Sequence, residues 1–310
     1  MIMNLKWLSY LLVINTILGA PIDMLTNSYA QKSEESLDWG IEVSQNTFYP
    51  GEPILLTLKV RSATKQEVKI NFGADGIEAF TMEMRDHSNK VVAKGDKIRR
   101  SGVTRMGLVR ILSGKIGQKS IVLNQWCSTL LPSGQYHCIC GVEYRLRHES
   151  RSHKAGPIHI TQLEFDITIV EMNRGEFGKI LEQLSKQAFK TKAKSRKELE
   201  NKWITKEMLA FAESDLAVPY QLKLATAATT TWMKWDAIKS LARSGTLEAA
   251  EGLMQIISED EDCCERIEDI KRETIDAIYR LRETGKPDIL NATDGFVRKY
   301  KRPVLPKSVD

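Results

Sequence analysis

The chain has 310 residues, of which 42% are apolar and 27% charged, and its formal net charge is +5 at pH 7. This ordinary globular composition excludes a largely disordered, collagen-like or multispanning membrane protein. The length predicts two folded domains, and five cysteines are too few for a small disulfide-stapled scaffold. Because the charge is modest and no nucleic-acid-binding motif accompanies it, we expect no nucleic acid as a partner.

Residues 1–30 are predicted to form a signal peptide. Lys6 precedes an apolar run over 7–20, which is too short for a membrane span of about 20 residues but suits the apolar region of a signal peptide. Ser28 and Ala30 then place small residues at the −3 and −1 positions of a cleavage site. We therefore expect an exported protein, either periplasmic or extracellular. A buried N-terminal helix and an uncleaved anchor are the alternatives.

Alternation of apolar and polar residues dominates the segment 37–172 and predicts short β-strands. The clearest runs, in each of which every second residue is apolar, cover 54–60, 68–72, 80–84 and 163–169. Turns rich in Gly, Pro, Asp and Ser separate them. Strands of this length and spacing favour an antiparallel β-sandwich.

Two stretches of this segment resemble immunoglobulin-like domains. The sequence FYPGEPILLTLKVRS at 48–62 resembles the entry from the first to the second strand of bacterial extracellular members. The sequence LLPSGQYHC at 130–138 looks like the corner of that fold that carries a tyrosine, which would be Tyr136. The inter-sheet disulfide of antibody domains is absent, because the second strand has no cysteine. The resemblance implies an immunoglobulin-like sandwich, a fold that mostly binds other molecules or acts as a spacer.

From about residue 173 the apolar period changes to 3.6, which predicts helices. We interpret 173–197 as a basic helical connector. Further on, the segments 236–245 and 276–285 lie 40 residues apart and match at Asp, Ala, Ile, Leu and Gly. Each predicts the end of a helix with its glycine in the left-handed conformation.

Helix starts are predicted directly after these two glycines, at Thr246 as a cap and at Pro287 as a first-turn residue. A weaker third copy covers 211–222, where Asp215 is expected to cap the second helix. The period of about 40 residues over 198–300 resembles HEAT or armadillo repeats, which implies helix pairs stacked into a short solenoid. An unrelated helical bundle is the alternative.

The predicted fold class is therefore multidomain, with an all-β immunoglobulin-like sandwich followed by an all-α HEAT-like repeat domain. The last ten residues, 301–310, are interpreted as a basic tail.

Cysteines are the first candidates for chemistry. In an exported protein, two of Cys127, Cys138 and Cys140 could form a disulfide. A tight hairpin would place Cys127 opposite Cys140, whereas a corner that moves the chain between sheets favours no pair. Buried free thiols are the alternative. A vicinal disulfide between Cys263 and Cys264 would be strained.

Histidines offer a weaker candidate. His148, His153 and His159 lie near Glu149 in a loop-like stretch, and this residue set suits a transition metal. Their spacing matches no helix face, so surface histidines are the simpler interpretation. The sequence also has no Gly-x-Ser-x-Gly motif and no Gly-rich phosphate loop. We therefore predict no catalytic, cofactor-binding or metal-binding residues.

Charged segments and tryptophans are candidates for contact with partners. Segment 174–206 has ten basic and four acidic residues, a balance of +6, and 259–269 has seven acidic residues and one Arg, a balance of −6. These segments predict solvated helix faces. The alternatives are contact of the basic segment with an anionic envelope polymer or lipid headgroups, and attraction between the two segments. Trp232 and Trp235 are three residues apart on a predicted helix, where they either pack in the core or contact a partner.

The function expected from these features is non-catalytic binding or scaffolding through protein–protein contacts, with a protein partner in the cell envelope or outside the cell. An enzyme whose site is assembled from scattered residues is one alternative. A proteinase-inhibitor-like role is another, because some bacterial sandwich domains with the Gly-Glu-Pro entry inhibit proteases.

Overall fold

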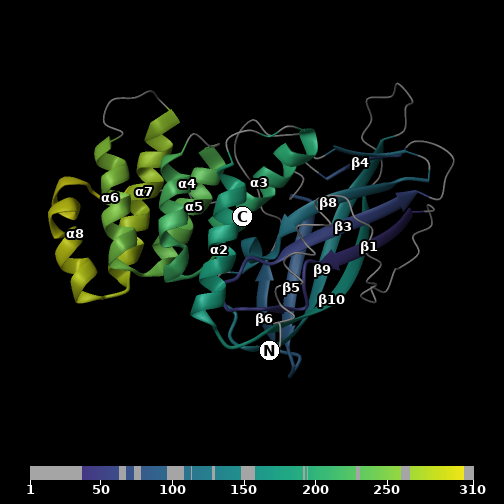
Figure 1. The fold of residues 1–310 in the computed structure, drawn as a ribbon, viewed down its shortest axis with the longest axis horizontal. Helices are drawn as coiled ribbons and strands as arrows, with labels where there is room; N and C mark the ends of the chain where they lie inside the picture. Colours follow the sequence, from purple (N-terminus) through teal and green to yellow (C-terminus); the bar gives the residue numbers. More distant parts are fainter. Residues whose placement is uncertain are drawn as a thin grey trace. The chain divides into compact units, whose positions relative to one another are not determined.

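A computed structural model gives the fold of the chain. It describes residues 37–62, 68–72, 78–95, 108–112, 114–127, 130–147, 158–190, 193, 195–227, 231–259 and 266–303. The predicted signal peptide, 1–30, lies outside these residues, as does most of the predicted basic tail. The chain divides into two compact units (Figure 1). The strand unit comprises Met1–Pro50 and Ile54–Glu171, and the helix unit comprises Gly51–Pro53 and Met172–Asp310.

The strands form two sheets of unequal size. The smaller sheet has three antiparallel strands in the order β1–β3–β8, which span Leu37–Val43 (β1), Leu55–Ser62 (β3) and Ile116–Val122 (β8). The larger has seven strands, which follow the path β2–β10–β9–β4–β7, with β5 beside β9 and β6 beside β5. They span Thr47–Phe48 (β2), Val68–Asn71 (β4), Phe80–Asp86 (β5), Val91–Gly95 (β6), Leu108–Ile111 (β7), Gly134–Arg147 (β9) and His159–Ile169 (β10).

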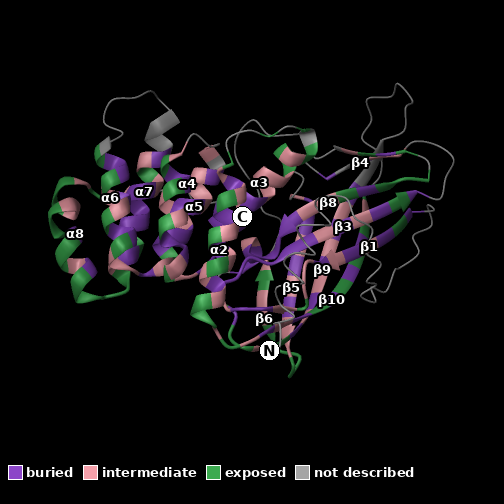
Figure 2. Cartoon of the chain, viewed as in Figure 1, coloured by how far each residue is buried: buried purple, intermediate pink, exposed green. Residues whose placement is uncertain are grey.

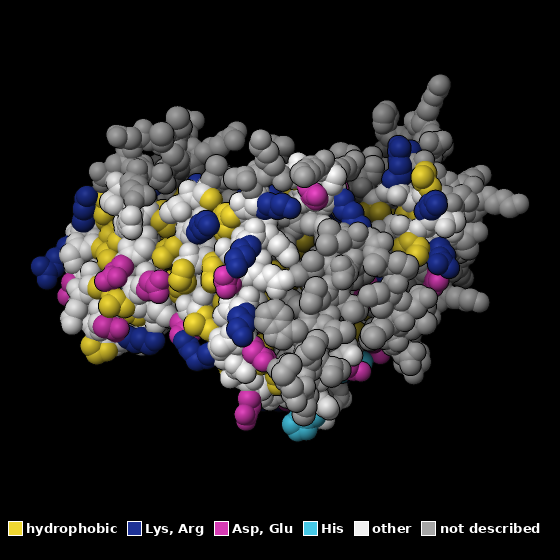
Figure 3. Space-filling view, in the orientation of Figure 1, with side chains coloured by type: hydrophobic (Ala, Val, Ile, Leu, Met, Phe, Trp, Pro, Cys, Tyr) yellow, Lys and Arg dark blue, Asp and Glu magenta, His cyan; other side chains and the backbone are white. Residues whose placement is uncertain are grey.

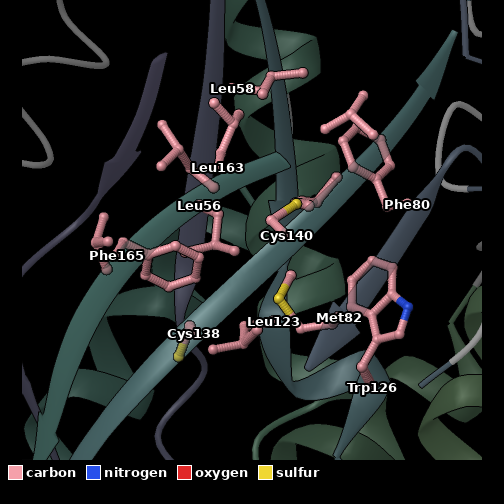
Figure 4. Close-up of a cluster of buried hydrophobic side chains, with 14 of the residues drawn as sticks. Leu56, Leu58, Phe80, Met82, Leu123, Trp126, Cys138, Cys140, Leu163 and Phe165 are labelled. Atoms are coloured by element: carbon pink, nitrogen blue, oxygen red, sulfur yellow. The ribbon is translucent and has the colours of Figure 1, made fainter. Parts of the chain in front are cut away.

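One hydrophobic cluster draws side chains from both sheets. Successive side chains of a strand point to opposite faces, so the alternating sequence of β1 and of β10 buries one face of the strand and leaves the other accessible (Figure 2). Leu56 and Leu58 from β3 lie in the same cluster as Phe80 and Met82 from β5 and Leu163 from β10 (Figure 4). The strands predicted from the alternating sequence therefore share a single core.

Strand β9 is the centre of the larger sheet. It pairs with β10 along the whole of β10, and on its other side with β5 and then β4. Strand β2 runs parallel to β10 and pairs with it only at Thr168 and Ile169. The larger sheet is therefore mixed, with one parallel pair at its edge.

The helix unit contains seven α-helices within the described residues. They span Arg174–Ala188 (α2), Arg196–Ala210 (α3), Val218–Thr226 (α4), Thr231–Ser244 (α5), Leu247–Glu259 (α6), Arg266–Glu283 (α7) and Pro287–Lys299 (α8). The expected connector, 173–197, contains α2 and belongs to this unit. Among these helices, none has both the length and the apolar character needed to cross a membrane.

Local signals at the helix ends were confirmed, with one exception. Gly245 and Gly285 have φ angles of 62° and 72°, the left-handed conformation predicted for them. Thr246 accepts a hydrogen bond from the N–H of Ala249, and Pro287 opens α8. The prediction that Asp215 caps α4 was wrong. A 3₁₀ turn over Asp215–Ala217 runs directly into α4, so the side-chain cap lies one residue earlier, at Ser214.

The expected fold class, an immunoglobulin-like sandwich followed by a HEAT-like repeat, was wrong. The structure is a mixed α and β chain. Its sheets have three and seven strands and include the parallel β2–β10 pair, whereas antibody domains divide their strands more evenly. The helices range from nine residues in α4 to eighteen in α7, so they do not repeat a unit of one size. Alternation and shared glycine caps are local properties, and they do not determine which strands or helices become neighbours.

Candidate interaction surface

The larger sheet has a polar face, which we call the outer face. It consists of the side chains of β5, β9 and β10 that alternate with the buried ones. Its accessible members are Thr81, Glu83, Arg85, Gln135, His137, Ile139, Glu143, Ile160, Gln162, Glu164 and Asp166. The pairing register places Arg85 beside His137 and His137 beside Asp166. Side chains far apart in sequence therefore form rows across three strands.

A histidine held by two carboxylates lies in the middle of this face. The His137 Nδ1 atom lies 2.9 Å from Asp166 Oδ1, and its Nε2 atom lies 3.5 Å from Glu164 Oε2. A histidine oriented by a carboxylate is one part of a catalytic triad, in which the other ring nitrogen faces a nucleophile. Here that nitrogen faces a second carboxylate. His137 therefore lies between two surface carboxylates, and neither of its two ring contacts is with a nucleophile.

Opposite charges extend this row onto β5. Arg85 lies 2.6 Å from Glu83, and Lys94 on β6 lies 3.4 Å from the same carboxylate. The hydrogen bond from Arg85 lowers the pKa of Glu83, so this carboxylate stays charged at neutral pH. Acidic side chains on β10 and mixed charges on β5 make the outer face polar along most of its width.

Isoleucines interrupt the polar character at the beginning of β10. Ile160 is 72% exposed and Ile158 is 50% exposed. Ile160 occupies the same parity as Gln162, Glu164 and Asp166, so it lies on the outer face. Ile158 directly precedes the strand. Two large apolar side chains are therefore exposed at this end of a mostly polar face.

The same part of β10 forms an edge of the sheet. The N–H groups of Thr168 and Val170 donate to Asn46 and Phe48 on the side away from β9. Backbone groups alternate in direction along a strand. The N–H and C=O groups of every second residue before Thr168 therefore also point away from β9, and these residues are Ile160, Gln162, Glu164 and Asp166. Strand β1 contacts β10 but pairs with β3. Within the described residues, this stretch of β10 therefore has no strand partner on one side.

The three candidate disulfide cysteines are buried in the strand unit as free thiols. Cys138 and Cys140 lie on the same face of β9, where the register places Cys140 beside Leu163 on one side and Met82 on the other (Figure 4). Cys127 follows a 3₁₀ turn over Leu123–Trp126 (η1). This turn connects β8 of the smaller sheet to β9 of the larger sheet. The expected hairpin that places Cys127 opposite Cys140 is therefore absent, because the chain changes sheets between them.

Burial also determines the chemistry of these thiols. It raises the pKa of Cys140 to about 12 and that of Cys138 further. The nearby Tyr136 hydroxyl donates a 2.7 Å hydrogen bond to the carbonyl of Pro132, as expected for a corner tyrosine. This hydrogen bond joins residues four positions apart in the chain, so it does not determine the arrangement of the sheets.

Other candidates from the sequence do not come together. Trp235 is half-buried, and its indole N–H has no hydrogen-bond partner within the described residues. The side chain of Trp232 lies outside those residues, as do His148, His153 and Glu149. His159 stacks on Tyr144 with ring centroids 5.2 Å apart. In the described part of the chain, no cluster of His, Cys, Asp and Glu side chains could hold a metal ion.

In the helix unit, accessible arginines pair with two buried carboxylates, which the sequence did not indicate. Arg243 Nε lies 2.8 Å from Glu213 Oε1, and burial raises the pKa of this carboxyl even though Arg243 lowers it. Asp276 is also buried and lies between Arg280 and Arg302, at 2.6 and 3.0 Å. The beginning of the predicted basic tail therefore packs against α7. The Asp276–Arg280 pair lies within α7, whereas Arg302 joins the residues after α8 to α7.

Comparison with known proteins gives only remote similarity. No protein-family model matches the chain, and no curated protein matches it. A putative ApaA protein from Bordetella pertussis is 10% identical over 44% of this chain and 96% of its own, with a TM-score of 0.27. A protein from Archaeoglobus fulgidus is 10% identical over 46% and 96%, with a TM-score of 0.19. The native form of E. coli alpha-2-macroglobulin is 11% identical over 88% of this chain and 22% of its own, with a TM-score of 0.24. Similarity this weak supports no inference about function.

Proposed function

We propose that this protein is an exported, non-catalytic binding protein that holds a partner protein by strand addition at the edge of β10 that lacks a strand partner within the described residues. One observation carries this proposal: outward-directed backbone groups from Ile160 to Asp166 coincide with an isoleucine that is 72% exposed. An unpaired edge is a template for another strand. Main-chain hydrogen bonds would supply affinity, and alternate side chains would supply specificity.

The side chains of this edge indicate the chemistry of the partner. Ile158 and Ile160 lie at one end of the edge, and Glu164 and Asp166 lie at the other. Apolar residues at one end of a partner strand, and Lys or Arg at its other end, would therefore favour its binding beside β10. The proposed partner is a protein with an extended segment of this pattern.

Selection from a random peptide library on the purified chain tests this proposal. We expect the enriched peptides to carry apolar residues toward one end and Lys or Arg toward the other. Gln162→Pro removes one outward N–H and leaves the bonds to β9 intact, because proline is tolerated on the open side of an edge strand. We expect this variant to bind enriched peptides about tenfold more weakly, since it loses a hydrogen bond and its ring blocks the approach of the strand.

Two further variants provide a matched comparison. Ile160→Lys places a charge on the proposed edge, whereas Ile116→Lys places one at an isoleucine of β8 that is 45% exposed. We expect only the first to weaken peptide binding, with circular dichroism and the thermal midpoint confirming that both are folded. Equal binding by Gln162→Pro, Ile160→Lys and the unaltered chain would contradict strand addition at β10.

A further inference from the structure

Three lysines of the helix unit gather where α2 ends. Phe189 follows the last residue of α2, and the Nζ atoms of Lys223 and Lys206 lie 4.2 and 5.9 Å from the centroid of its ring. The Nζ atom of Lys202 donates a 2.7 Å hydrogen bond to the carbonyl of Lys190, the next residue along. Figure 3 shows Lys and Arg side chains over α2 and α3 on the face in view.

The fold brings these lysines together from separate helices. Lys202 and Lys206 are one turn apart on α3, so they point from the same side of that helix. Lys223 lies on α4, and α3 contacts both α2 and α4. We call Lys202, Lys206 and Lys223 the lysine cluster. Its geometry depends on three packed helices and is not a property of one basic segment.

Among the described residues, no carboxylate forms an ion pair with a member of the lysine cluster. The neighbouring Lys186, by contrast, pairs with Glu182 at 2.6 Å. The pKa of Lys206 is lowered, first by its burial and then by the charge of Lys202. The end of α2 contributes about half a negative charge, and the ring of Phe189 offers a weak cation–π contact. Together, the partial negative charge of the helix end and the cation–π contact neutralise less than the charge of three ammonium groups.

We infer that the lysine cluster is a binding site for a phosphate group. Lysine binds phosphate as a compact point charge with three donors. These three ammonium groups lie beside two consecutive residues, Phe189 and Lys190, and a multiply charged anion suits such a concentration of positive charge. A phosphate group could belong to a soluble molecule or to a lipid headgroup, and the chemistry of recognition is the same. This site is independent of the proposed strand addition, because it lies in the helix unit.

Two probes test this inference and distinguish the sources. Titration calorimetry with inorganic phosphate measures binding of a soluble phosphate. Sedimentation with lipid vesicles measures binding of a headgroup. Vesicles of phosphatidylcholine that contain phosphatidylglycerol are compared with vesicles of phosphatidylcholine alone. We expect the triple variant Lys202→Gln, Lys206→Gln, Lys223→Gln to lose binding, and each single variant to weaken it about tenfold.

The matched control is a second triple variant in which three lysines with carboxylate partners are replaced by Gln, so the net charge changes by the same amount. These lysines are Lys59, Lys186 and Lys239. We expect this control to bind as the unaltered chain does, with circular dichroism confirming that both triple variants fold. Binding of phosphate alone assigns a soluble ligand, and binding of the anionic vesicles assigns a headgroup. Binding of neither probe, or equal losses in both triple variants, would overturn the inference.

Discussion

Cys138 and Cys140 illustrate how burial determines the chemistry of a residue. Both are 0% exposed in the core of the strand unit, and transfer of a thiolate into such surroundings is unfavourable. The pKa of Cys140, about 12, leaves almost no thiolate at neutral pH. Because the thiolate is the reactive form, these residues behave as small apolar side chains.

We therefore expect both thiols to resist iodoacetamide in the native chain and to react after unfolding in urea without a reductant. Mass spectrometry of the digested protein would locate the modification at each residue. A parallel sample unfolded with a reductant provides the control. Protection that persists in urea and disappears only with the reductant would show a disulfide, and would contradict the free thiols of the structure.

At the scale of elements, the glycine that follows α7 sets the direction of the chain. Gly285 has a φ of 72°, and a Cβ atom placed there would meet no atom within 4 Å. The cost of a side chain at this position is therefore purely conformational. Gly295 also has open space around it, but it lies inside α8, where glycine is less favourable than alanine.

Gly285→Ala is expected to lower the free energy of unfolding by about 1–2 kcal/mol, since the left-handed conformation disfavours a Cβ atom. Gly295→Ala is expected to raise it by about 0.5–1 kcal/mol, because alanine loses less backbone entropy in a helix. Urea unfolding followed by circular dichroism measures both. Changes of the same sign in the two variants would contradict this difference between the sites.

These elements also show how far the sequence predicts the fold. The glycines at 245 and 285 could be predicted because a helix end depends on a few adjacent residues. The row formed by Arg85, His137 and Asp166 could not, because it depends on the register between three strands. The lysine cluster was missed for a similar reason. The sequence indicated its basic segment, but Lys223 joins it only through the packing of α4 against α3.

At the scale of the whole molecule, the two units have separate hydrophobic cores. The cluster in the strand unit contains only residues between Leu37 and Ile169. In the helix unit, Leu181, Leu241 and Ile278 are 0% exposed. A domain with its own core is able to unfold as its own cooperative unit. The free energy of unfolding of this chain is therefore expected to be divided between two transitions.

Leu56→Ala and Leu241→Ala test this division, because each truncates a side chain that is 0% exposed, one in each unit. Each change is expected to destabilise its own unit by about 2–5 kcal/mol, from lost apolar burial and the cavity left behind. Calorimetry should then show that Leu56→Ala lowers the midpoint of one transition and Leu241→Ala lowers that of the other. If both variants lowered one shared midpoint by similar amounts, the two cores would have to melt as a single cooperative unit.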